Sequence, residues 1–220
     1  MTGPLAALLR DVAAGRYPPP DGGVTILPQP SPRDAGVLAF TAHSVIFVDA
    51  DPAWMRGLLP PGDLSGPLLP PFLQAVGART GRRLNNIDLL CVAQARPGLP
   101  PAESQLTPVT HPGHPPADHP RVLRARRYRD DLRVWQAPGG IVALGRGLAG
   151  RWEILVEIDP GCRGRGLGRE LVAAARHLVP DGTPLWAQIA PGNAASVRAF
   201  LAAGYQPVGA EALLPAADGG

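Results

Sequence analysis

The second half of the chain alternates between short apolar runs and segments in which apolar residues recur every three or four positions. Residues 152–158 are rich in β-branched and large apolar side chains, which predicts a strand. Leu and Ala at helical spacing over about 168–179 predict a helix that packs one face on a sheet. The alternation continues with a strand at 185–190, a helix at 194–203 and a strand near 206–214. This succession is typical of an α/β fold.

A hairpin and a basic helix are expected just before this series. Leu132–Gln136 and Ile141–Leu144 flank the tetrapeptide Ala-Pro-Gly-Gly, a turn signal between two apolar runs. Upstream, Asp118 as N-cap and Pro120 in the first turn predict a helix that runs to about Arg129.

The first half of the chain has a similar mixture of patterns. The expected elements are a short amphipathic helix within Met1–Arg16, two strands within Val37–Val48 that break near His43-Ser44, a helix from Asp51-Pro52 to Leu59, a helix that stops at Gly81 and a strand over Ile87–Ala93. This half is therefore also α/β-like, but it contains no chemical motif.

Proline and glycine divide the chain into segments. The 28 prolines and 27 glycines gather in clusters, and the longest cluster, residues 97–120, predicts a Pro/His-rich linker or long loop. We accordingly expect an N-terminal α/β segment of unknown role at 1–96 and a second domain at 121–220. The predicted fold class is α/β (α+β), with a central mixed twisted sheet flanked by helices. After the strand at 206–214 little chain is left for a further strand.

Composition limits the classes of function. The net charge is +3, and every basic residue other than histidine is arginine, so the arginine count alone carries little information. There is no apolar run long enough to span a bilayer, and Met1–Arg16 does not resemble a signal peptide. Cys91 and Cys162 are too few for a disulfide framework or a cysteine metal cluster. A reducing cytoplasm is the expected location, with no membrane partner.

A glycine-rich loop follows the predicted strand at 152–158. Its sequence is Arg163-Gly164-Arg165-Gly166-Leu167-Gly168, and a predicted helix begins at its end. A strand, a glycine loop and a helix start together turn backbone N–H groups toward a phosphate, and arginines add charge. The spacing matches neither the dinucleotide fingerprint G-x-G-x-x-G nor a Walker loop, because the third glycine is one residue early and Gly-Lys-Ser/Thr is missing.

A second motif lies downstream and, together with the loop, resembles a known family. It runs from Asn193 through Ser196 and Phe200 to Gly204-Tyr205, a helix with an N-cap and a C-terminal glycine. Arg163-x-x-Gly166-x-Gly168 and this segment, in this order, resemble the GNAT superfamily of acyl-CoA-dependent N-acetyltransferases over about residues 132–214. The resemblance implies that acetyl-CoA is a co-substrate and that an amine is the acetyl acceptor.

The resemblance implies roles in binding acetyl-CoA. Backbone groups of Val156 and Ile158 would hydrogen-bond the pantetheine arm between the strands at 152–158 and 185–190. Asn193 would reach the pantetheine or the thiol end. The pyrophosphate would be held by the loop residues Arg163, Gly164, Arg165, Gly166, Leu167, Gly168 and Arg169.

The candidate catalytic residues are Glu153 and Glu157, because the acceptor ammonium must lose a proton before attack. They are four residues apart and point to one face of a regular strand, although a bulge would change that. A surface or ion-paired role is the alternative for each. Phe200 stands where many family members carry a tyrosine that protonates the leaving thiolate. Water, Tyr128, Ser196 or Tyr205 would have to supply that proton.

Other features have simpler readings. His111, His114, Asp118 and His119 fit a flexible linker better than a metal site, so no metal is expected. The arginines of the predicted basic helix at 121–129 are more simply explained as a solvent-exposed face than as a nucleic-acid contact. A protein that holds acyl-CoA without catalysis is the second functional hypothesis. The acceptor and the oligomeric state are left open, with a homodimer as one form.

Overall fold

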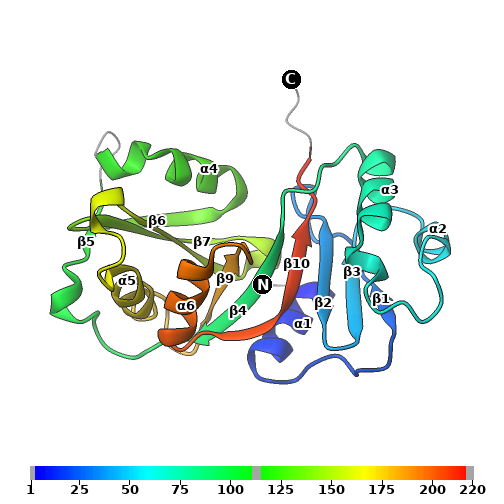
Figure 1. The fold of residues 1–220 in the computed structure, drawn as a ribbon, viewed down its shortest axis with the longest axis horizontal. Helices are drawn as coiled ribbons and strands as arrows, with labels where there is room; N and C mark the ends of the chain where they lie inside the picture. Colours follow the sequence, from blue (N-terminus) through cyan, green and yellow to red (C-terminus); the bar gives the residue numbers. More distant parts are fainter. Residues whose placement is uncertain (1–2, 111–114, 217–220) are drawn as a thin grey trace. The chain divides into compact units, whose positions relative to one another are not determined.

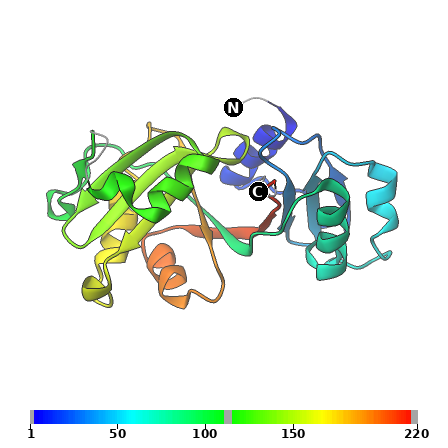
Figure 2. The ribbon, with the colours of Figure 1, turned by 90° about the horizontal axis from the view of Figure 1, so that it is seen from above.

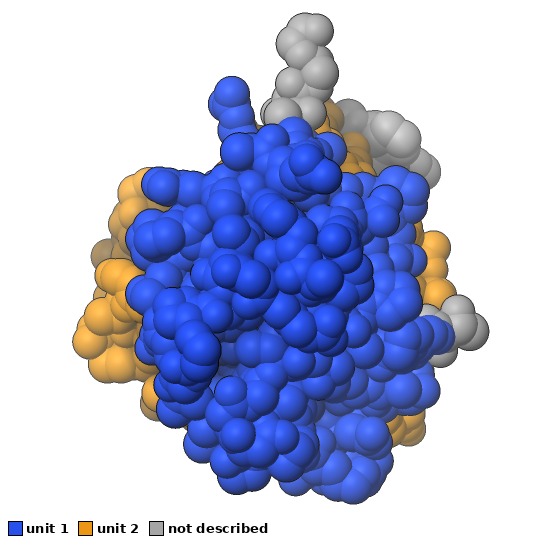
Figure 3. All heavy atoms as spheres, turned by 90° about the vertical axis from the view of Figure 1, so that its right-hand side faces the viewer, with its two compact units in different colours: residues 1–90, 208–220 blue, residues 91–207 orange. Residues whose placement is uncertain are grey.

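The computed structural model describes residues 3–110 and 115–216. The chain forms two compact units (Figure 3), one made of residues 1–90 and 208–220 and the other of residues 91–207. The chain enters the second unit within strand β4 (Ile87–Gln94) and leaves it within strand β10 (Gln206–Leu213), so both strands contribute to both units.

Unit 1 combines a small mixed sheet with helices. Its other elements are α1 (Pro4–Ala13), β1 (Val24–Ile26), β2 (Gly36–Phe40), β3 (His43–Phe47), α2 (Pro52–Gly57), a 3-10 turn at Gly66–Leu68 and α3 (Pro70–Thr80). The strand order is β1-β3-β2-β10-β4. The pairing of β1 with β3 is parallel, and β2 pairs antiparallel with both β3 and β10. The predicted helices and strands of this half are therefore present.

The core of unit 1 lies between its sheet and the helices α2 and α3. Val37 and Ile46 from the sheet meet Met55 of α2 and Phe72 and Val76 of α3, all buried. The same cluster includes two residues from the far end of the chain, Ala212 and Leu214. The C-terminal strand is thus part of the core of the N-terminal unit.

Local signals set most boundaries in unit 1. The Asp51 carboxylate accepts a hydrogen bond from the Ala53 N–H at 3.0 Å and caps α2, and Gly81 ends α3 at φ 67°. The predicted break near His43-Ser44 is present, slightly earlier than expected: the turn includes Ala42, which takes φ 52°, and His43 is already in β3.

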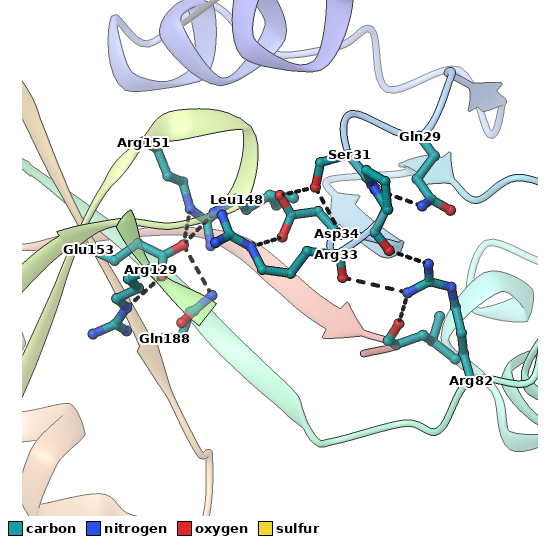
Figure 4. A network of polar contacts seen from close by, with 12 residues as sticks. Gln29, Ser31, Arg33, Asp34, Arg82, Arg129, Leu148, Arg151, Glu153 and Gln188 are labelled. Atoms are coloured by element: carbon teal, nitrogen blue, oxygen red, sulfur yellow. Dashed lines mark hydrogen bonds and ion pairs between the residues drawn. The ribbon is translucent and has the colours of Figure 1, made fainter. Parts of the chain in front are cut away.

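Two polar clusters tie the loops of unit 1 to its frame. The buried His43 ring lies 2.8 Å from an Asp21 carboxylate oxygen and 2.9 Å from the Thr25 hydroxyl. Arg82 donates to the carbonyl oxygens of Pro32 and Leu214 at 2.6 and 3.0 Å (Figure 4). Each cluster joins the segment around residues 21–34, which has little regular structure, to the strands.

Unit 2 contains the elements around the glycine loop. They are β5 (Thr107–Pro108), α4 (Pro120–Tyr128), β6 (Asp130–Ala137), β7 (Gly140–Arg146), β8 (Trp152–Ile158), α5 (Leu167–Ala175), β9 (Pro184–Ile189) and α6 (Ala194–Ala202), with 3-10 turns at Ala102–Ser104, Pro115–Asp118, Leu148–Gly150 and Pro160–Cys162. The strand order is β10-β4-β9-β8-β7-β6-β5. The β5–β6, β6–β7 and β7–β8 pairs are antiparallel and the β8–β9 pair is parallel. The predicted mixed sheet is confirmed.

Helices cover both faces of the unit 2 sheet. Figures 1 and 2 show α4 on one face and α5 on the other. Val122 of α4 packs against Val134, Ile141, Ala143 and Leu155, and α5 buries Leu171, Val172, Ala174 and Ala175. The two faces of β8 therefore meet different helices.

Two details of unit 2 differ from the predictions, and the position of β4 in the sheet was not predicted. The N-cap of α4 is His119, whose Nδ1 accepts from the Arg121 N–H at 3.2 Å, because Pro120 is the first helical residue. Helix α5 ends at Ala175, before the predicted position 179. The strand β4 lies between β9 and β10, so β9 takes its second neighbour from the first half of the chain. Among the described residues, no helix has the length and apolar character needed to cross a membrane.

Candidate active site

Strands β8 and β9 are paired only where they begin. The parallel register joins Trp152 to Leu185 and Glu153 to Trp186 and stops there, although β8 continues to Ile158 and β9 to Ile189. On its other side β8 is paired with β7 along its whole length, from Trp152 to Ile158, without a bulge. The later part of β8 is therefore open toward β9 in the described structure.

Backbone groups of β8 can be assigned to the two sides of the strand. Asp159 N–H donates to the Gly139 carbonyl at 2.9 Å, next to the Ile158–Gly140 pair of the β7–β8 ladder. Antiparallel ladders alternate between residues that bond to the partner and residues that face away, so the backbone groups of Ile158 and Val156 face the β9 side. The Arg163 Nε donates to the Ile158 carbonyl at 3.1 Å, which agrees with an Ile158 carbonyl that is not bonded to β7. Val156 and Ile158 thus offer backbone hydrogen-bonding groups to the opening between β8 and β9.

The glycine loop lies directly beyond β8 and is open to solvent. Gly164 and Gly166 have φ of 76° and 90°, and Gly166 is the N-cap of α5. Within the described residues, no acceptor is recorded for the backbone N–H groups of residues 164–168. Helix α5 begins at Leu167, so its positive dipole end lies at this loop. Exposed backbone N–H groups at a helix start are the kind of arrangement that suits an anion, and we refer to residues 163–169 as the anion cradle.

Three arginines surround this cradle, and their environments differ. Arg163 is engaged with β8, through the Ile158 carbonyl and the Glu157 carboxylate. Arg165 and Arg169 are exposed. A bound anion would find two exposed guanidinium groups and one that is already in use.

Glu153 is the centre of a buried ion-pair network (Figure 4). Its carboxylate accepts from Arg151 Nε at 2.8 Å, from Arg129 Nε at 3.0 Å and from the Leu148 N–H at 3.2 Å. Only 4% of Glu153 and 1% of Arg151 are exposed. Burial acts to raise the pKa of the Glu153 carboxyl, but Arg151 and Arg129 outweigh it and leave the pKa below its ordinary value. Glu153 is therefore an ionised carboxylate with its oxygens in use.

The backbone around Glu153 is shaped to admit this network. A Cβ on Gly147 would lie 2.2 Å from the Glu153 carboxyl, so only glycine fits there. Arg151 also lies over the Trp186 ring, with its Cζ 5.2 Å from the ring centroid. These contacts fix the strand where β8 and β9 are still paired.

Glu157 lies on the same face of β8, in the open part of the strand. Its carboxylate is 2.7 Å from Arg121 Nη1 and 3.1 Å from Arg163 Nη2. Its side chain is 18% exposed, and those of its two partners are 58% and 61% exposed. Glu157 is therefore clamped by two arginines that solvent can reach.

The helix α4 and its C-cap supply one partner to each glutamate. Arg121 lies in the first turn of α4, and Arg129 is the extended residue that directly follows its last helical residue, Tyr128. They are eight residues apart, about 12 Å along the helix direction, and Glu153 and Glu157 are four residues apart, about 13 Å along a strand. The similar lengths let the two ends of α4 hold both carboxylates. Sequence reasoning assigned these arginines to a solvated face, although the matched spacing was the signal that could have revealed their partners.

The second motif forms α6 and its ends. The Asn193 side-chain oxygen accepts from the Ser196 N–H at 3.1 Å and caps α6, and Asn193 is exposed. Phe200 is buried and meets the Tyr205 ring edge to face, with the ring centroids 5.0 Å apart. Burial raises the pKa of the Tyr205 hydroxyl, and this residue is 2% exposed. Tyr205 therefore holds its proton firmly.

In the described residues, neither a metal-ligating cluster nor either of the two cavities described below coincides with the glycine loop. Among the described residues, no group of three His, Cys, Asp or Glu side chains could hold a metal ion, and His111 and His114 lie outside the described residues. One cavity of about 330 Å³ lies in unit 1 against α3, and one of about 510 Å³ lies in unit 2, lined by residues that include Val109, Arg126 and Trp135. Neither of these two cavities is lined by the glycine loop, which is an open surface feature.

Comparison with known proteins identifies the domain that carries the loop. Residues 106–205 match the model of the Acetyltransferase (GNAT) family, a span that runs from β5 to the end of the second motif. This part of the chain is a GNAT acetyltransferase domain, and the family resemblance seen in the sequence is confirmed. The family transfers acyl groups from acyl-CoA.

Solved structures also match. A GCN5-related N-acetyltransferase from Kribbella flavida is 18% identical, with a TM-score of 0.40, over 67% of this chain and 64% of that one. A protein assigned to the GNAT family of acetyltransferases from Novosphingobium aromaticivorans is 16% identical, with a TM-score of 0.43, over 61% of this chain and 66% of that one. The chain thus spans less than two thirds of either structure. The search of curated proteins found no match.

Proposed function

We propose that the protein is an N-acetyltransferase that moves an acetyl group from acetyl-CoA to a primary amine of a small molecule or peptide by direct attack. The observation that carries the proposal is the opening between β8 and β9, which leads to the free amides of the glycine loop. A flexible arm with backbone-like amides suits the opening, and a pyrophosphate suits the helix start.

In this proposal each part of acetyl-CoA has its own partners. The pantetheine arm bonds the backbone of Val156 and Ile158, and its thiol end lies near Asn193. The pyrophosphate is held by the N–H groups of residues 164–168, with the Arg165 and Arg169 side chains beside it. The two exposed arginines and the dipole of α5 act on the same anion, which supports this assignment.

The contacts favour Glu157 over Glu153 as the proton acceptor. Glu157 lies on the open part of β8 and both of its arginine partners are largely exposed, so they can rearrange. Glu153 is buried and bonded on both oxygens, and its lowered pKa makes it a weak base. We assign Glu153 a positioning role, in which it fixes β8 where the opening begins.

The transfer then follows ordinary acyl chemistry. The ammonium gives a proton to Glu157, directly or through a water molecule, and the amine lone pair attacks the thioester carbon. The carbonyl electrons move to oxygen, where a backbone N–H near Ile158 donates to the oxyanion. Collapse restores the carbonyl and expels the thiolate, and the nitrogen, which still carries two protons after the attack, gives one of them to solvent as the amide forms. Phe200 carries no proton to give, and a free thiol has a pKa of about 8.5, so the thiolate can take its proton from water.

Thiol release tests the proposal. With acetyl-CoA and a panel of small primary amines and amine-terminated peptides, at least one acceptor should release thiol faster than the background without amine. Complete absence of CoA binding in a calorimetric titration would overturn the assignment.

A non-catalytic acyl-CoA-binding role is the second candidate. Two observations favour it: Phe200 replaces the usual proton donor, and Glu157 is held by two arginines. Tight CoA binding without turnover on any amine, unchanged by Glu153→Gln and Glu157→Gln, would select this function.

A further inference from the structure

The Arg163 side chain contacts two groups that the proposed reaction requires. Its Nη2 lies 3.1 Å from a Glu157 carboxylate oxygen, and its Nε donates to the Ile158 carbonyl at 3.1 Å. The first is the proposed proton acceptor, and the second is a proposed contact of the pantetheine arm. One side chain therefore blocks both the acceptor chemistry and part of the donor site.

Arg163 is also the first residue of the anion cradle. It directly precedes Gly164, and its side chain is 61% exposed. An exposed ion pair is weakly held, whereas a phosphate accepts two parallel hydrogen bonds from one guanidinium. A pyrophosphate in the cradle is thus a stronger partner for Arg163 than Glu157 is.

We propose that Arg163 is a switch residue that couples acyl-CoA binding to the release of Glu157. In the free protein it holds Glu157 and the Ile158 carbonyl. When the pyrophosphate enters the loop, Arg163 turns to it and leaves Glu157 with Arg121 alone. The inference rests on the proposed function, because it takes CoA as the ligand of the loop.

The switch has a thermodynamic consequence that needs no acceptor. If Glu157 and the pyrophosphate compete for Arg163, the Glu157 carboxylate weakens CoA binding, and removing it tightens the complex. Arg163 carries this effect, so the effect disappears when Arg163 is absent. The two residues therefore show coupling in a double-mutant cycle.

Calorimetric titration of CoA measures the cycle. Glu157→Gln should tighten CoA about threefold, within the range of an exposed ion pair. Arg163→Gln should weaken CoA, and Glu157→Gln added to Arg163→Gln should change affinity by less than about 1.5-fold because no competition is left.

Two matched controls separate the switch from a general charge effect. Glu170 lies in the first turn of α5, beside Gly166, so Glu170→Gln removes a similar charge near the loop without touching Arg163. Its effect should be the same with Arg163 present or replaced. Arg165→Gln should weaken CoA but preserve the gain from Glu157→Gln.

The outcomes are distinct. Absence of CoA binding by the unchanged protein would overturn the proposed function itself. Normal CoA binding with no gain from Glu157→Gln, or with the same gain in the Arg163→Gln background, would overturn the switch alone. Circular dichroism checks the fold of each variant, and Arg163→Lys, which retains charge but cannot make both contacts at once, should reduce the coupling if Arg163→Gln is unstable.

Discussion

The two halves of β8 hold the same kind of residue in opposite settings. Glu153 lies where β8 is paired on both sides, with Arg151 and Arg129 and almost no solvent. Glu157 lies where the strand is open, between two exposed arginines. Both carboxylates face α4 and both are ion-paired. Burial and strand pairing, rather than residue type or partner type, therefore distinguish the environments of the two carboxylates, and the proposed division into a positioning residue and a proton acceptor rests on this difference.

The largest expected effect is on stability at the buried end. Glu153→Gln should lower the free energy of unfolding by about 3–5 kcal/mol, because it removes the negative charge that the buried Arg151 and Arg129 guanidinium groups share. Glu157→Gln should lower it by less than about 1 kcal/mol. Urea unfolding measures both, and equal losses would contradict the contrast.

Turnover should depend more on Glu157 than stability does. Glu157→Gln should lower kcat/KM for the amine by about 10²- to 10⁴-fold, the usual contribution of a positioned base, while CoA binding is retained. Steady-state kinetics with the best amine from the panel provide the measurement, and Glu170→Gln is the matched control. Retention of full activity by Glu157→Gln would move the proton acceptor elsewhere.

Alanine substitution should affect stability differently at two nearby glycines of the loop. Gly166 has φ 90°, so Gly166→Ala should cost about 1–2 kcal/mol. Gly168 is helical, and a Cβ there would lie 3.7 Å from Ile158 Cγ1, an ordinary contact. Gly168→Ala should therefore be neutral or stabilise by up to about 1 kcal/mol. Thermal unfolding checks both, and equal destabilisation would show that crowding rather than backbone conformation governs the loop.

The pH dependence of stability should follow the buried carboxylate. The pKa of Glu153 is lower in the folded protein than in the unfolded chain, so its stabilisation is complete above the unfolded pKa of about 4.3 and is lost as pH falls through the folded pKa. The stability gap between the unchanged protein and Glu153→Gln should be widest near neutral pH and shrink below about pH 4. Urea unfolding from pH 7 to pH 3 measures the gap, and a constant gap would argue against an ionised Glu153.

The smallest effect concerns the two cysteines, which repeat the contrast between buried and open positions. Burial raises the pKa of the Cys91 thiol in β4 to about 11, and Cys162 lies half-buried beside the glycine loop. A thiol reagent should label Cys162 in the native protein and both cysteines after denaturation. Rapid native labelling of Cys91 would indicate that β4 opens readily.

Sequence reasoning succeeded where the determining chemistry is local. The strand at 152–158, the cap at Asn193 and the helix stop at Gly81 all depend on neighbouring residues, and all are present. His119 rather than Asp118 caps α4 because Pro120 takes the first helical position, a local rule that places the cap one residue later.

The failures concern partners that are distant in the chain. The strands β1 and β5 have three and two residues, too short for an alternating pattern, and exist only because β3 and β6 pair with them. The ion pairs of Glu153 and Glu157 depend on where α4 crosses the sheet, which no local pattern specifies. The candidate loop could thus be predicted in detail, while the state of its two carboxylates could not.

The place of β10 has a consequence for synthesis on the ribosome. The core of unit 1 needs Ala212 and Leu214. These residues are made roughly 120 residues after Leu90, where the N-terminal segment of unit 1 ends. The nascent N-terminal segment must therefore wait with exposed apolar surface while unit 2 is translated, and its core is completed only after Leu214 has been made. Chaperone demand should accordingly fall on the first half of this protein, the half without the acetyltransferase motif.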